Sequence, residues 1–163
     1  MKKQVDFEEL GEALRADTQA FIDTYATNHP ADGPLVAFCL YFDSQLDGTG
    51  MLLPQRALAE NPDITVSDVA AWYYYGDHVQ GRLSEGTARL FRRYEKQLEK
   101  ADDEEGEALV ARFQALMGQV LRRLTFDKLT RTPDFVFFAC GMDEDYDDWD
   151  ATIPPALRQL HFD

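Results

Sequence analysis

The sequence has few residues of several types, and each shortage excludes a class of protein. Among 163 residues there are 2 cysteines and 3 histidines, too few and too scattered for a disulfide framework or a spaced set of metal ligands. No apolar run approaches the roughly 18 residues that a membrane span requires, and the N-terminus has no apolar stretch of the kind found in secretion signals. We therefore expect a cytoplasmic protein, not associated with membranes, that folds without a metal or other cofactor.

Both cysteines lie inside apolar segments of the sequence. Cys39 and Cys140 are each flanked by hydrophobic residues, where a thiol packs as a small hydrophobic side chain. We expect both to stay reduced in the cytoplasm. Neither is a candidate nucleophile or ligand.

Basic residues are scarce as well, and this shortage says most about possible partners. The chain has 16 Lys and Arg against 30 Asp and Glu, a formal net charge of −14. Residues 1–81 carry 13 acids and 4 bases, and residues 132–163 carry 8 acids and 1 base. The middle of the chain, residues 82–131, is nearly neutral, with 9 acids and 11 bases. Such a balance repels nucleic acid and attracts basic proteins over long range. Solubility alone is the competing explanation.

The acidic excess is densest where a hydrophobic segment ends. The apolar run from Phe135 to Ala139 predicts a strand buried on both faces. Six carboxylates then fall within the eight residues 143–150, interrupted only by two aromatic residues. We predict that this segment binds a protein partner, with charge from the acids and anchoring area from the aromatic rings. Its residues are Asp143, Glu144, Asp145, Tyr146, Asp147, Asp148, Trp149 and Asp150.

Hydrophobic periodicity predicts the other elements. Three long helices are expected at residues 7–27, 84–101 and 104–125, and the last two form a helical hairpin. Strands are expected at residues 35–43 and 51–53, the two joined by an Asp47-Gly48 turn. Short helices are expected at residues 55–60 and from about Pro154. This order predicts a single α+β domain over residues 1–163, in which the N-terminal helix and the hairpin cover a small, mostly antiparallel sheet.

The segment from Pro62 to Gly81 has no clear period, and we predict that it is irregular. It contains four consecutive aromatic residues, from Trp72 to Tyr75, which cannot all face one side of a regular element. At least two of them should pack in the core. Exposed ones would anchor a partner, so Trp72 and Tyr74 are added to the predicted partner-binding residues.

No catalytic or metal-binding pattern stands out. The spacing of Asp143, Asp145 and Asp147 is that of the first ligands of a calcium loop, but Asp148 replaces the required glycine and Pro154 the required glutamate. We therefore predict no metal site.

Acid and base chemistry also lacks a specific pattern. Carboxylates are so abundant that no particular pair is informative. Asp77-His78 is the one place where a proton-transfer group is worth seeking, although a surface loop is the simpler interpretation. We predict a protein that is not an enzyme.

The layout of the chain resembles the bacterial domain-of-unknown-function 4303 family. The likeness covers the opening helix, PLVAFCLYFDSQLDGTGMLLP, the WYYYGD segment, the helical pair and VFFACGMDEDYDDWD. Two features match: a strand that ends in the pattern Tyr-x-Asp, from Tyr41 to Asp43, and a hydrophobic strand late in the chain that is followed directly by acidic residues. The resemblance implies an immunity protein encoded beside a polymorphic or contact-dependent toxin, and it brings no active-site residues.

The expected function is therefore neutralisation of a cognate, basic toxin by direct binding. Two alternatives remain open. One is a carboxylate-dependent enzyme with a pocket between the helical pair and the sheet. The other is a housekeeping interaction protein with no toxin.

Overall fold

The computed structural model describes residues 4–43, 48–75, 79–139 and 153–162. Within these ranges, the side chains at positions 42, 43, 73–75 and 79 are not described.

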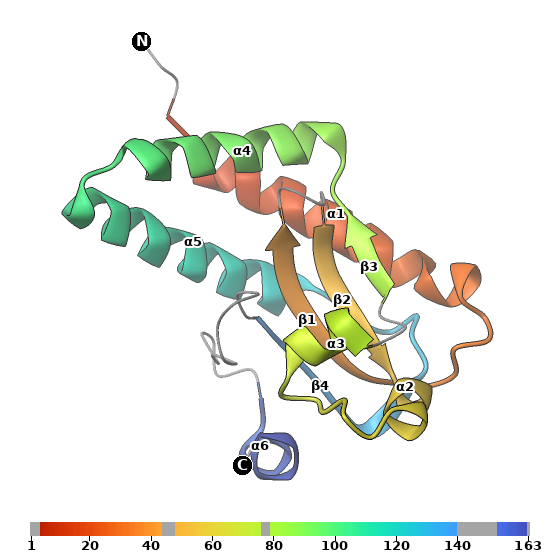
Figure 1. Cartoon of the computed structure of the whole chain (residues 1–163). Coiled ribbons are helices and arrows are strands. Elements are labelled where there is room, and N and C mark those ends of the chain that lie inside the picture. Colours follow the sequence, from red (N-terminus) through yellow and green to blue (C-terminus); the bar gives the residue numbers. More distant parts are fainter. Residues whose placement is uncertain (1–3, 44–47, 76–78, 140–152, 163) are drawn as a thin grey trace.

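A mixed sheet of four strands forms the centre of the molecule (Figure 1). Its spatial order is β3-β2-β1-β4. β2 pairs antiparallel with both β1 and β3, whereas β1 and β4 are parallel. The strands are β1 (Leu35–Asp43), β2 (Gly48–Pro54), β3 (Val79–Arg82) and β4 (Arg131–Ala139).

Three long helices cover one face of the sheet: α1 (Phe7–Asn28), α4 (Glu85–Lys100) and α5 (Asp103–Arg123). α4 and α5 form a hairpin whose turn projects away from the strands (Figure 1). Asp6 caps α1 by accepting hydrogen bonds from the backbone amides of Glu8 and Glu9 at 3.0 and 3.1 Å. The inward faces of these helices pack on one face of β1 and β2 and form the larger core.

The opposite face is covered by short elements. These are α2 (Gln55–Glu60), α3 (Val69–Tyr75) and α6 (Pro155–His161). They build a second core with alternate residues of β1 and β4, among them Val136 and Phe138. The sheet is therefore buried on both sides, which explains why β1 is apolar on both of its faces.

Most predicted elements are confirmed, including the α+β class and the helical hairpin. β1 and α2 have the predicted bounds, and the long helices agree to within two residues at each end. The strand after the first turn begins earlier than predicted, at Gly48. The predicted turn at Asp47 and the residues after Ala139, Cys140 included, lie outside the described ranges.

The prediction for residues 62–81 is wrong in part. Residues 62–68 are irregular as predicted, but Val69–Tyr75 form α3 and Val79–Arg82 form β3. α3 starts after Asp68, which accepts a hydrogen bond from the Ala71 amide at 3.1 Å. β3 is four residues long and forms by pairing with β2, a partner about 30 residues earlier, so it has no local pattern of its own.

Candidate functional site

The structure describes only part of the predicted partner-binding surface. Residues 143–150 lie outside the described ranges, as do Asp77 and His78. Tyr74 belongs to α3, but its side chain is not described. The surface predicted at 143–150 therefore stays a prediction.

Trp72 is a core residue, so its prediction as a partner contact is wrong. Its side chain is 0% exposed, and Nε1 donates a hydrogen bond to the Thr65 carbonyl oxygen at 2.8 Å. The ring lies edge-on to Phe138, with 6.0 Å between centroids. The physical reason is that α3 packs on the sheet and turns this residue inward, where the indole satisfies its one donor.

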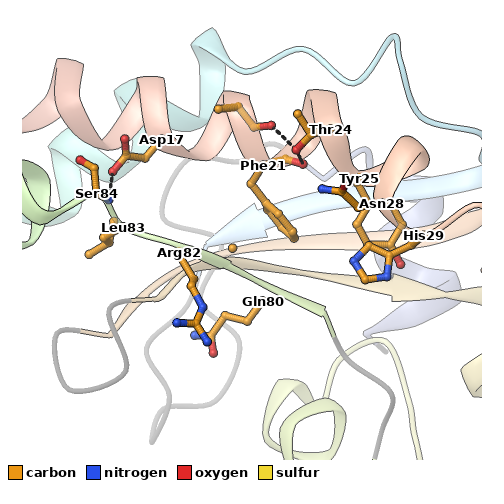
Figure 2. Close-up of a pocket in the computed structure, with 12 residues that line it drawn as sticks. Asp17, Phe21, Thr24, Tyr25, Asn28, His29, Gln80, Arg82, Leu83 and Ser84 are labelled. Carbon is orange, nitrogen blue, oxygen red and sulfur yellow. Dashed lines mark hydrogen bonds between the residues drawn. The ribbon is translucent and has the colours of Figure 1, made fainter.

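A groove runs between α1 and the edge strand β3 (Figure 2). Its volume is about 490 Å³. Phe21 and Tyr25 point from α1 toward β3, while Gln80 and Arg82 extend from the strand on the side away from the helix. The groove therefore follows the outer edge of the sheet.

α1 approaches β3 closely at Gly81. A Cβ atom at this position would lie 2.7 Å from the Phe21 ring and 2.8 Å from the Thr49 carbonyl oxygen. Beside it, the amide nitrogen Nε2 of Gln80 is buried and has no hydrogen-bond partner among the described residues. A buried donor without a partner costs about 1–3 kcal/mol.

A polar cluster lies near the C-terminus of α1 and includes Tyr25, which lines the groove. The Tyr25 hydroxyl donates to Asp32 at 2.5 Å, and Arg56 donates to the other oxygen of the same carboxylate at 3.1 Å. Burial raises the pKa of Tyr25 far above its ordinary value, and the hydrogen bond to Asp32 raises it further. Tyr25 therefore remains a donor that holds the α1–β1 connection, and it does not serve as a base.

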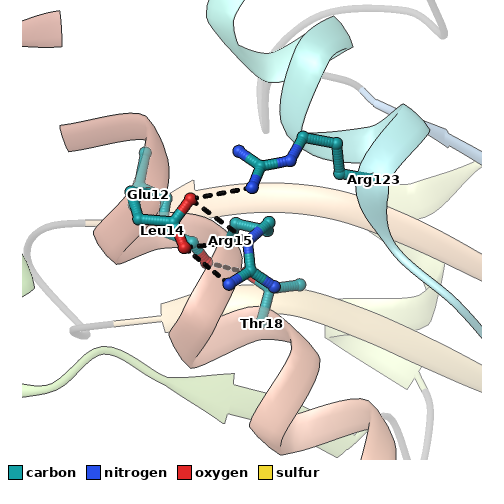
Figure 3. A network of polar contacts seen from close by, with 5 residues as sticks. All are labelled: Glu12, Leu14, Arg15, Thr18 and Arg123. Atoms are coloured by element: carbon teal, nitrogen blue, oxygen red, sulfur yellow. Dashed lines mark hydrogen bonds and ion pairs between the residues drawn. The ribbon is translucent and has the colours of Figure 1, made fainter. Parts of the chain in front are cut away.

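A second polar network ties α1 to α5 (Figure 3). The Glu12 carboxylate binds Arg15 at 2.6 Å and Arg123 at 3.0 Å. The hydrogen bond from Arg15, followed by that from Arg123, lowers the pKa of Glu12 to about 2. This network joins two helices at the surface and has no group positioned to react with a ligand.

An acidic surface at the α4–α5 turn was not singled out from the sequence. We call it the hairpin-tip surface; it consists of five exposed carboxylates at the turn, and three of them, Asp102, Asp103 and Glu107, border an apolar floor. The floor includes Val110, a hydrophobic side chain that is 38% exposed, and Leu98. A pocket of about 410 Å³ lies over it. The carboxylates are those of Asp102, Asp103, Glu104, Glu105 and Glu107.

The described residues give no support to a catalytic pocket of converging carboxylates. None of the carboxylate side chains that the structure describes is buried. No group of three or more His, Cys, Asp and Glu in that part of the chain is placed to hold a metal ion. Among the helices described, none is both long and apolar enough to traverse a lipid bilayer.

Comparisons with known proteins leave the family open. No family model matches the chain, and no match was found among curated proteins or solved structures. The resemblance to the domain-of-unknown-function 4303 family therefore stays a prediction.

Proposed function

We propose that this chain is a binding protein that holds a basic protein partner against its acidic surface. The observation that carries the proposal is the display of charge. The net charge is −14, and none of the described carboxylates is withdrawn into the core. Charge arranged in this way speeds encounter with a basic partner and suppresses encounter with acidic ones.

The hairpin-tip surface supplies a described part of that interface. Its turn projects from the body of the fold (Figure 1), so a partner can reach it from several directions. The apolar floor at Val110 and Leu98 adds area that a hydrophobic anchor can bury, while the surrounding carboxylates pair with Lys and Arg. An apolar centre within a charged rim is the usual arrangement of a protein interface.

The partner in this proposal is a bacterial toxin that the chain neutralises. Resemblance of layout and the absence of a catalytic pattern in the sequence support it. The acidic segment 143–150, which lies outside the described residues, stays a separately predicted contact with this partner. Replacing Asp145, Asp147 and Asp148 with Asn is expected to slow association and to flatten its salt dependence. Unchanged kinetics would remove that segment from the interface.

The test at the hairpin tip compares two variants of equal net charge. Glu104→Gln/Glu107→Gln removes two carboxylates from the hairpin-tip surface. Asp63→Asn/Asp127→Asn removes two exposed carboxylates elsewhere. Association with the toxin encoded beside this chain is followed by stopped-flow fluorescence at several salt concentrations.

The proposal expects the first variant to associate more slowly, by up to about tenfold at low salt, because steering raises association rates by orders of magnitude. The second variant should stay within about twofold, since its charges act only through the weaker long-range field. Equal slowing in both would show a general effect of net charge. It would exclude the hairpin tip from the interface.

A further inference from the structure

α4 has a basic face, although the protein as a whole is acidic. Arg93, Lys96 and Lys100 are exposed and spaced three and four residues apart, which places them on one side of the helix. The buried residues Phe91 and Tyr94 lie on the side that packs in the core. The three cations therefore lie on the side of α4 that faces away from the core.

This basic face forms one wall of a pocket. The chain before α1 passes beside α4 (Figure 1), where the backbone amide of Val5 donates to Gln97 Oε1 at 3.0 Å. That contact and the start of α5 close the space to a pocket of about 580 Å³. The volume lies within the range of about 300–1,000 Å³ that is typical of small-molecule sites. Besides Ala101, it is lined by Gln4, Arg93, Lys96, Gln97, Lys100 and Glu105.

The lining charges favour an anion. Three cations and one carboxylate give the pocket a local charge of +2, by subtraction of one from three. Among the residues that the structure describes, neither Arg93 nor Lys96 has an ion-pair partner, whereas Arg89, one turn earlier, pairs with Glu85 at 3.3 Å. At physiological salt, charges beyond about 8 Å are largely screened. The lining residues therefore outweigh the distant carboxylates.

We propose that this pocket binds a phosphorylated small molecule. One planar guanidinium and two ammonium groups match the several oxygens of a phosphate better than the two of a carboxylate. The pocket is larger than one phosphate, and the amides of Gln4 and Gln97 with the Glu105 carboxylate provide partners for hydroxyl groups. Nucleic acid does not fit, because its backbone would meet the carboxylates of the adjoining hairpin tip.

A sugar phosphate and a nucleotide share this chemistry, so the experiment uses three probes: pyrophosphate, ribose 5-phosphate and ADP. Each is titrated into the full chain at physiological ionic strength, about 0.15 M, and amide shifts of residues 93–101 are followed by NMR. The proposal expects saturable shifts there with at least one probe. If ribose 5-phosphate binds most tightly, the natural ligand is a sugar phosphate, and if ADP does, it is a nucleotide. If pyrophosphate binds most tightly, the pocket recognises phosphate groups alone. The site is refuted if no probe gives saturable shifts in this segment.

Two variants of equal charge complete the test. Arg93→Gln/Lys96→Gln removes two pocket cations, and Arg89→Gln/Lys128→Gln removes two exposed cations outside the pocket. The first should weaken binding at least about tenfold, because each lost charged hydrogen bond is worth about that factor. The second should change it less than about twofold, since surface charges at a distance are screened. Equal weakening by both variants would overturn the proposal. All four side chains are exposed, so neither variant should disturb the fold.

Discussion

Two buried threonines allow a stability prediction that depends on the direction of one hydrogen bond. Thr18 on α1 and Thr49 on β2 are both 0% exposed, and their hydroxyl oxygens are 2.5 Å apart. The Thr18 hydroxyl also donates to the Leu14 carbonyl oxygen at 2.7 Å (Figure 3). Since a hydroxyl has a single proton, Thr49 must be the donor between the two threonines.

This direction makes the two Thr→Val variants unequal. Thr18→Val leaves the Thr49 hydroxyl buried without its acceptor, which costs about 1–3 kcal/mol. Thr49→Val leaves Thr18 still bound to Leu14, so only the net value of one hydrogen bond is lost, about 0.5–1.5 kcal/mol. In the double variant no orphaned hydroxyl remains. Its cost should be smaller than the sum of the two by about 1 kcal/mol.

The free energy of unfolding is measured for all four proteins by urea denaturation, with the fluorescence of the buried Trp72 as reporter. The structure predicts that Thr18→Val is the more costly single change and that the two changes are not additive. Equal costs, or strict additivity, would refute the hydrogen-bond direction and the coupling between α1 and β2.

Three further predictions follow from the packing and from the pKa shifts. Gly81→Ala should destabilise the protein by about 1–3 kcal/mol, because the added Cβ atom would clash with Phe21. Gly86→Ala should not destabilise it, because no heavy atom lies within 4 Å of a Cβ atom added there. Urea denaturation compares the two variants. Burial raises the pKa of Tyr94 to about 12, so the neutral phenol contributes stability to the fold below pH 10, and this stability is lost as pH rises toward 12. In thermal melts over this alkaline interval, Tyr94→Phe should therefore lose less stability than the unaltered protein. The pKa of Glu12 is lowered to about 2, so the stability that its carboxylate contributes is present above pH 4 to 5 and is lost as pH falls toward 2. Glu12→Gln should make the melting temperature less dependent on pH over that acid interval. An unchanged dependence on pH would contradict the network.

Elements with a long, regular pattern could be predicted from the sequence. The stripe behind Asp6 and the apolar run from Leu35 to Asp43 each contain enough repeats to define both ends of an element. β3 has only four residues, and its pairing with β2 is non-local. Neither its existence nor its place at the sheet edge has a local cause that sequence reasoning can find.

The candidate sites show the same division. The acids of the hairpin-tip surface stand close together in the sequence, around the start of α5, but their projection from the fold depends on how α4 and α5 pack. The spacing of Arg93, Lys96 and Lys100 in the sequence shows only that they share one side of a helix. The contact of Val5 with Gln97, 92 residues apart in the chain, is what makes them line a pocket. Trp72 was misplaced for a related reason, because an aromatic residue in a short segment suits either a core or an interface.

Co-expression with the protein encoded immediately upstream tests the central claim most directly. Growth is measured when that protein is produced alone, with this chain, and with the Glu104→Gln/Glu107→Gln variant. If the account is correct, the upstream protein is toxic and basic, this chain restores growth by binding it, and the variant binds more slowly at low salt. A harmless upstream protein, or rescue without a complex between the two chains, would contradict it.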